Sequence, residues 1–148
     1  MVEALLVSSE IAFENAKKFF HACESAEGWA GCASYVADGA GFTAQSEPVA
    51  DITTVEAYTE WMKAFGTVTA AGCTYDLHSH SFDEASQTAL FFATFNGTHV
   101  GDGGPVPPTN QTTHSHYVYA LKMDAAGKVS HMTKIWNAPW AMRELGWG

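Results

Sequence analysis

Residues 117–137, YVYALKMDAAGKVSHMTKIWN, are the stretch that decides the fold. Two runs of β-branched and aromatic residues flank a polar turn containing Asp124 and Gly127, a pattern typical of a β-hairpin. Successive side chains of a strand point to opposite faces. One face is expected to present Ser115, Tyr117, Tyr119, Leu121, Ser130, Met132, Lys134 and Trp136. The other is expected to present His114, His116, Val118, Ala120, Val129, His131, Thr133 and Ile135. Both faces are largely apolar, so each should pack against something, one of them as the wall of a cavity.

The composition limits the class of protein. A chain of 148 residues with 47% hydrophobic content is most simply one domain, residues 1–148, with a proper core. Its net charge of −9 argues against nucleic acid and anionic membranes as partners. No run approaches the roughly 18 apolar residues of a membrane span. The start, Met1 to Leu6, lacks the features of a signal peptide, which favours a cytoplasmic location. The three widely spaced cysteines indicate reduced, partly buried thiols.

Helical patterns dominate the first half of the chain. A capping serine at position 8 or 9 and an apolar stripe predict a helix running to about Glu24. A shorter helix is expected from Trp29 to about Val36, and residues 53–56 have capping-box spacing that opens a third. Residues 139–145 are expected to form a terminal helical turn.

Strand patterns follow. Residues 42–44 predict a short strand, and residues 74–82 and 88–100 predict two long ones before the hairpin. Residues 101–109 contain three glycines and three prolines, which indicates a surface loop. Three helices followed by four antiparallel strands predict an α+β fold, with the helices packed on one face of a curved sheet.

Several short motifs, in this order, resemble one known family. They are Asn96 to Gly101, Gly104 to Thr109, Gly127 to Val129, Ile135 to Asn137 and Leu145 to Trp147. Together they resemble the nuclear transport factor 2-like superfamily, in its SnoaL-like polyketide cyclase branch, over nearly the whole chain. The resemblance implies a cone of curved antiparallel sheet on three N-terminal helices, with a deep, mostly apolar pocket. It also implies a homodimer and no metal or cofactor. This cone hosts isomerases, cyclases, dehydratases, hydrolases and pure binding proteins, so it does not fix the activity.

The resemblance can be applied position by position. Tyr119 falls where ketosteroid isomerases have a pocket carboxylic acid and polyketide cyclases a histidine. Lys134 falls where the cyclases place their catalytic aspartate, Phe20 near the isomerases' phenol donor and Ala44 near their general-base aspartate. The resemblance therefore implies that this chain lacks both family bases.

Three residues are candidates for catalysis. Tyr119 and Lys134 share one hairpin face, so in an apolar cavity a phenol and an amine could bind a carbonyl oxygen and stabilise an enolate. The alternative is that Lys134 reaches the pocket mouth or a surface carboxylate, as most lysines do. His99 is in phase with Phe91 and Phe95 along the strand. It is an acid–base candidate near residues 101–109, the proline loop.

Several large side chains are candidates for ligand binding. They are Trp29, Tyr35, Tyr58, Trp61, Phe91, Phe95, Tyr117, Met132 and Trp136. Most such side chains belong to the core, but in a cone with an open cavity some would line it. That would favour a hydrophobic small-molecule ligand that is flat or cyclic.

Two His-x-His pairs, at 78–80 and 114–116, could suggest a metal site. No acidic residue stands at a suitable interval, so structural or interface histidines are the simpler interpretation. The second pair lies on the outer hairpin face, where a homodimer contact is expected.

The sequence thus predicts a SnoaL-like enzyme that acts on an apolar carbonyl compound by cofactor-independent proton transfer, as a cyclase, isomerase or dehydratase. One alternative is a non-catalytic binding protein for a hydrophobic ligand. Another is a structural dimer module.

Overall fold

The computed structural model describes residues 7–148. The expectation that the chain lacks a signal peptide concerns residues outside this range. The helices are α1 (Ser9–Glu24), α2 (Gly28–Cys32), α3 (Val55–Ala64) and α4 (Ala138–Glu144). The strands are β1 (Val36–Ala44), β2 (Thr74–Asp83), β3 (Thr88–Thr98), β4 (Thr112–Met123) and β5 (Val129–Trp136). Between residues 7 and 148, no helix is both long and apolar enough to cross a membrane.

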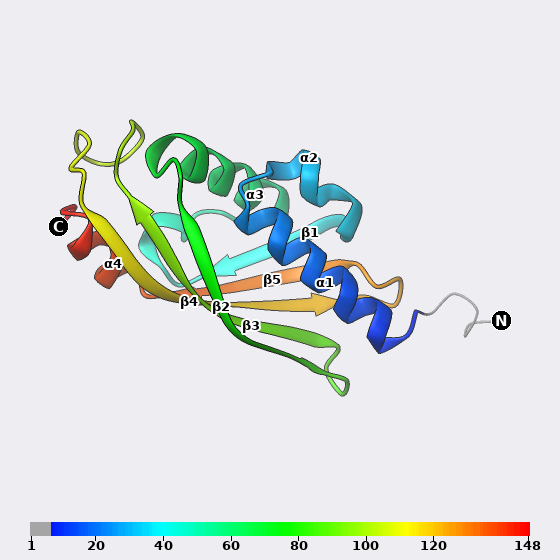
Figure 1. Ribbon diagram of the computed structural model, residues 1–148. Helices are drawn as coiled ribbons and strands as arrows, with labels where there is room; N and C mark the ends of the chain where they lie inside the picture. The colour runs from blue at the N-terminus through cyan, green and yellow to red at the C-terminus, as the bar shows by residue number, and fades with distance from the viewer. Residues whose placement is uncertain (1–6) are drawn as a thin grey trace.

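The strands form one mixed sheet in the order β1-β5-β4-β3-β2. Strands β2 to β5 pair antiparallel, as predicted, but β1 pairs parallel with β5. The expectation of a wholly antiparallel sheet is therefore wrong at this edge. The sheet curves but does not close, because β1 and β2 remain as its two edges (Figure 1).

The sequence pattern predicted this strand to begin at residue 42, but β1 begins at Val36. Asp38, Gly39 and Gly41 look like turn residues, and an irregularity in the pairing falls between Val36 and Gly41. Pairing with β5 supplies this stretch with hydrogen-bond partners, which outweighs its low strand propensity. For the same reason the second helix does not reach Val36: α2 ends at Cys32 and continues only as a 3₁₀ turn, Ala33–Tyr35.

The helix starts follow the predicted capping chemistry. The Ser8 hydroxyl accepts a hydrogen bond from the backbone N–H of Ile11 at 3.2 Å. The Thr54 hydroxyl accepts one from Ala57 at 3.1 Å. Such caps satisfy backbone donors that have no partner within the helix. Helix α3 continues as a π-helical turn, Phe65–Thr69.

Helices α1, α2 and α3 cover one face of the sheet, and the core lies between the two layers (Figure 1). Phe20 of α1 stacks on Phe91 of β3 with ring centroids 4.7 Å apart. The opposite face of the sheet carries exposed apolar side chains, among them Leu90, Phe92 and Ile135.

The hairpin register places the predicted inner face in the core, except for Ser130, which is only half-buried. Tyr119 lies opposite Lys134, and Tyr117 lies opposite Trp136. One assignment was wrong: Val129 is fully buried on the inner side. A register irregularity at Met123, which pairs with Val129, shifts the alternation there.

Candidate active site

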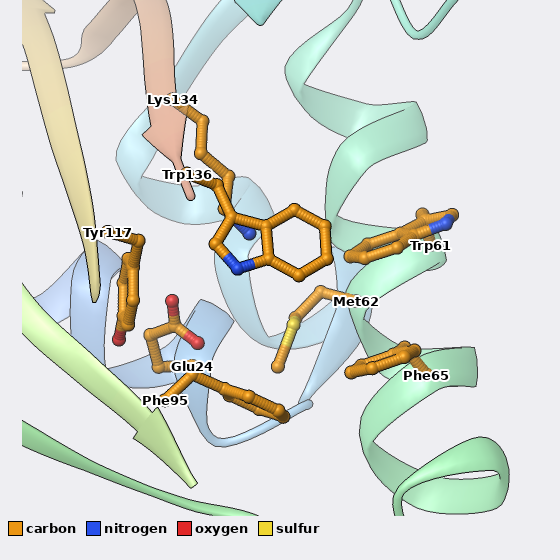
Figure 2. Close-up of a pocket in the computed structure, with 8 residues that line it drawn as sticks. All are labelled: Glu24, Trp61, Met62, Phe65, Phe95, Tyr117, Lys134 and Trp136. Carbon is orange, nitrogen blue, oxygen red and sulfur yellow. The ribbon is translucent and has the colours of Figure 1, made fainter. Parts of the chain in front are cut away.

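A small cavity lies between the helices and the inner face of the sheet. It is lined by Glu24, Trp61, Met62, Phe65, Phe95, Tyr117, Lys134 and Trp136 (Figure 2). These side chains converge from α1, from α3 and its π-helical turn, and from β3, β4 and β5. The cavity measures about 10 Å³, room for about one water molecule. The deep open pocket that the family resemblance implies is thus mostly filled by aromatic side chains.

Lys134 projects from β5 into this cavity and is only 5% exposed. Its Nζ donates a hydrogen bond to the Tyr58 hydroxyl at 2.7 Å. Four aromatic rings also surround the ammonium, with centroids 4.8 Å (Trp136), 4.9 Å (Tyr58), 5.5 Å (Trp61) and 5.5 Å (Tyr117) away. The electron-rich ring faces partly replace the water that the cation loses on burial.

Glu24, the last residue of α1, supplies a carboxyl group to the same cavity. Burial raises the pKa of Glu24, and the positive charge of Lys134 opposes that shift. Burial lowers the pKa of Lys134, and the negative charge of Glu24 opposes that shift in turn. The two groups attract each other without forming a direct ion pair in the part of the chain that the structure describes. Buried groups whose pKa values are shifted toward their neutral forms are typical of sites that transfer protons.

The Lys134 hydrogen bond begins a chain of hydroxyl groups. The Tyr58 and Tyr119 hydroxyl oxygens are 3.2 Å apart, and Tyr119 Oη donates to Cys23 Sγ at 3.5 Å. Because Tyr58 accepts from Lys134, its own proton is free to bond Tyr119. Burial raises the pKa of both phenols. Both phenols are therefore neutral hydrogen-bond donors.

Tyr117 contributes a hydroxyl that lies beside the Glu24 carboxyl but makes no well-formed hydrogen bond among residues 7–148. This oxygen is buried, and burial together with the nearby charge of Glu24 raises its pKa. An unpartnered donor in a cavity beside a carboxyl and an ammonium is a natural contact for a ligand oxygen.

The other candidate ligand contacts divide into three groups. Trp61, Phe95 and Trp136 line the cavity with Tyr117, and Tyr58 contacts it through Lys134. Phe91 and Met132 are fully buried in the core and do not line this cavity. Trp29 and Tyr35 are partly buried at the edge of the core and do not line this cavity either.

His99, the third catalytic candidate, lies apart from Lys134. It is fully buried, and its Nδ1 accepts hydrogen bonds from Trp147 Nε1 at 2.9 Å and from the Thr109 N–H at 3.3 Å. It is not among the residues that line the cavity with Glu24 and Lys134. The fold therefore brings together Tyr119, Tyr58 and Lys134 but holds His99 beneath the proline loop.

A wider groove adjoins the small cavity on the outside. It has a volume of about 340 Å³ and is lined by Glu47, Pro48, Trp61, Phe65, Gly103, Pro105, Trp136, Met142 and Trp147. Trp61, Phe65 and Trp136 border both spaces and form the wall between them. Gly103 and Pro105 belong to the loop that the sequence predicted, so this loop borders the groove.

Sequence reasoning missed Glu24, which it treated only as the end of a helix. A signal was present, because Glu24 follows Phe20 by four positions and so continues the apolar stripe of α1. A carboxyl on the buried side of an amphipathic helix requires a partner or a function.

The two histidine pairs have other partners. His78 Nε2 bonds Thr94 Oγ1 at 2.7 Å, and His114 Nδ1 bonds Asn96 Oδ1 at 2.7 Å, on the exposed side of the sheet. Among residues 7–148, no three His, Cys, Asp or Glu side chains come together as a metal site would require.

Sequence comparison gives no assignment: no family model matches this chain, and no curated protein sequence matches it.

Solved structures are similar in fold. AclR of Streptomyces galilaeus, a proposed hydroxylase, superposes with a TM-score of 0.75 at 18% identity, over 95% of this chain and 88% of its own. A proposed SnoaL-like polyketide cyclase of Jannaschia sp. CCS1 gives 0.75 at 15% identity, over 92% of each chain. An NTF2-like protein of Burkholderia xenovorans LB400 gives 0.67 at 16% identity, over 93% of this chain and 98% of its own. At these identities the likeness concerns the fold alone, and at that level it confirms the sequence resemblance: the chain has the fold of these NTF2-like and SnoaL-like proteins.

Proposed function

We propose that the protein is a small-molecule enzyme that transfers a proton next to the carbonyl group of an apolar compound, without a cofactor. One observation carries the proposal: Glu24 and Lys134 line the same buried, aromatic cavity. The proposed cyclase activity of a structural neighbour is in keeping with carbonyl chemistry on this fold.

A structural role alone is a weak explanation for this pair. Two ionisable groups lose their hydration when buried, and apolar residues of similar size often stabilise a core as well or better. Glu24 and Lys134 also form no direct ion pair that would offset this cost. Buried groups with shifted pKa values in a cavity are typical of catalytic sites.

The arrangement suits enolate chemistry. The Glu24 carboxylate would take the proton from the carbon beside the carbonyl, and the electron pair would move onto the carbonyl oxygen. The Lys134 ammonium and the free Tyr117 hydroxyl would bond this developing oxyanion. Return of the proton to another carbon gives isomerisation, and attack of the enolate carbon on a second carbonyl gives cyclisation.

The substrate would enter through the groove of about 340 Å³. The inner cavity of about 10 Å³ does not admit an organic molecule as it stands. Trp61 and Trp136 separate the two spaces, with ring centroids 6.3 Å apart and an angle of 63° between the rings. Rotation of one of these rings would join the spaces and bring a carbonyl group to Lys134.

The test uses 2-tetralone, a bicyclic ketone with acidic protons beside its carbonyl. Exchange of these protons in D₂O, followed by NMR, should be faster with the protein than in matched buffer. Glu24→Gln and Lys134→Met should each lower the catalysed rate by about 10²-fold or more. Glu14→Gln, on the exposed side of α1, is the matched control and should leave the rate unchanged. No acceleration by the native protein, or equal rates in all variants, would refute the proposal.

A second candidate function is binding without chemistry. The filling of the inner cavity by aromatic rings favours it, because a ligand could then occupy only the outer groove. Micromolar binding of 2-tetralone together with an unaccelerated exchange rate would support this alternative.

A further inference from the structure

We infer that His99 is the hydrogen-bond donor of a second polar subsite, which binds an oxygen atom of a flat, apolar ligand at the loop end of the groove. The inference rests on the proposed function in one respect, because it takes the groove as the entrance for the ligand. It adds a requirement on that ligand, namely an oxygen acceptor outside the cavity that Glu24 and Lys134 line.

The hydrogen bonds of His99 assign its tautomer. Nδ1 accepts from Trp147 Nε1 at 2.9 Å and from the Thr109 N–H at 3.3 Å. A ring nitrogen that accepts carries no proton, so the proton of the neutral ring lies on Nε2. His99 is therefore arranged to donate from Nε2, rather than to take up a proton there.

This donor has no partner. His99 is fully buried, and its Nε2 makes no hydrogen bond within residues 7–148. Buried donors are nearly always satisfied, so an orphan N–H calls for an explanation. The hydrogen bond from Trp147, together with the longer one from Thr109, holds the ring in place and keeps Nε2 pointing in one direction.

Nε2 faces the backbone of Gly104. A Cβ atom added to Gly104 would lie 3.1 Å from Nε2, and 3.0 Å from both His99 Cε1 and Trp147 Cζ2. The flanking residues Gly103 and Pro105 line the groove, as does Trp147. Gly104, whose neighbours in the chain line the groove, therefore packs closely against the His99 donor.

The segment that covers His99 is weakly held. On one side the Thr69 carbonyl accepts from the N–H groups of Val100 and Gly101, at 3.0 and 3.1 Å. On the other, the Thr109 hydroxyl donates to the Leu145 carbonyl at 2.6 Å. Between these anchors the structure records no hydrogen bond for residues 103–108. Such a segment opens at low cost, which would expose Nε2 to the groove.

The chemistry of the ligand follows from its surroundings. A neutral N–H donor pairs with a keto, ether or hydroxyl oxygen. The groove walls are Trp, Phe, Pro and Met side chains, which favour flat rings. The subsite therefore selects a planar, apolar ligand that carries an oxygen at its edge.

The test compares two probes that differ by one oxygen. 9-Fluorenone and fluorene are flat tricycles of nearly equal size, and only fluorenone has a carbonyl acceptor. Quenching of tryptophan fluorescence gives both dissociation constants, because Trp61, Trp136 and Trp147 line the groove. The native protein should bind fluorenone about tenfold more tightly than fluorene.

Two variants assign the oxygen to its donor. His99→Phe should remove the preference for fluorenone while keeping the affinity for fluorene. Lys134→Met should keep the preference. Equal affinities in the native protein, no binding of either probe, or a preference lost only in Lys134→Met would overturn the inference.

A direct measurement covers the case in which His99→Phe fails to fold. In native protein with ¹⁵N-labelled histidine, long-range ¹H–¹⁵N spectra should show His99 protonated on Nε2. The Nε2 resonance should move on addition of fluorenone and not of fluorene. A proton on Nδ1, or a resonance that ignores fluorenone, would refute the subsite. Because these tests measure binding, their outcome is independent of whether Glu24 and Lys134 catalyse exchange.

Discussion

The ammonium of Lys134 donates its hydrogen bond to the hydroxyl of Tyr58, 2.7 Å away, and not to that of Tyr119, which lies opposite it in the hairpin. Tyr58 comes from α3, so a helix residue and not a strand neighbour fixes the position of the amine. The bond extends through the Tyr119 hydroxyl to Cys23 on α1. Lys134 is therefore held from the helical layer, on the side where Glu24 also lies.

Replacing Tyr58 by Phe should remove the hydrogen bond that stabilises the Lys134 ammonium. The ammonium would lose its acceptor but keep the aromatic rings around it, so its pKa should fall further. The catalysed exchange rate should drop by roughly tenfold to a hundredfold, the value of a hydrogen bond to a charged group. The alkaline limb of the pH–rate profile should also move to lower pH.

Tyr119→Phe is the matched control for this change. It removes a hydroxyl of the same chain but leaves the bond between Lys134 and Tyr58 in place. Its alkaline limb should stay near that of the native protein. An alkaline limb that is the same in Tyr58→Phe and the native protein would exclude the proposed role of Tyr58.

The pH dependence of exchange should be bell-shaped. Activity requires Glu24 as a carboxylate and Lys134 as an ammonium. Burial raises the pKa of Glu24 above its ordinary 4.5 and lowers that of Lys134 below its ordinary 10.5. Both limbs of the profile should therefore fall inside this interval, after subtraction of the buffer-catalysed rate. A rate that rises steadily with pH beyond 10.5 would show that the lysine charge is not needed.

Stability should respond to pH through Glu24. A carboxyl whose pKa is raised on folding stabilises the protein below its unfolded pKa, and this contribution is lost as pH rises through the folded pKa. Lys134→Met removes the charge that opposes the shift, so the pKa of Glu24 should rise further. Urea unfolding of Lys134→Met should then show stability falling more steeply than in the native protein as pH rises above 4.5, the ordinary pKa of the carboxyl.

The double variant Glu24→Gln with Lys134→Met controls for the loss of lysine packing. It has no ionisable group left at either position, so the steeper fall of stability with pH should disappear. It should also be more stable than Lys134→Met alone at pH 8, by about 1–4 kcal/mol, because no unpaired carboxylate remains buried. Parallel pH curves for all three proteins would contradict the assignment of this effect to Glu24.

We expect a homodimer through the exposed face of the sheet. Ile135 is 62% exposed there, and Leu90 and Phe92 are also exposed on this face. Apolar side chains on one sheet face favour association with a second copy. Sedimentation at micromolar concentration should give a dimer for the native protein and a monomer for Ile135→Asp. Glu14→Gln, an exposed change on α1 away from this face, should remain dimeric. A monomeric native protein would refute the prediction.

Local patterns in the sequence were sufficient for much of the framework. The caps at Ser8 and Thr54 act on backbone groups three residues away, so neighbouring residues determine them. Alternation about the Gly127 turn predicted the inner face of the hairpin and placed Lys134 opposite Tyr119. The alternation failed at Val129 and Ser130, where an irregularity in the strand pairing shifts the phase.

What the tertiary structure decided depends on contacts between segments far apart in the chain. Turn-like residues around Gly39 become strand because β5 offers them a parallel partner. Glu24 looks like an ordinary helix end until packing buries it in one cavity with Lys134. Trp61 and Trp136 could equally have left a pocket open, and only their packing together closed it to about 10 Å³. A periodic pattern indicates which side of a segment is buried; which groups then meet, and how much space remains between them, is determined by long-range packing.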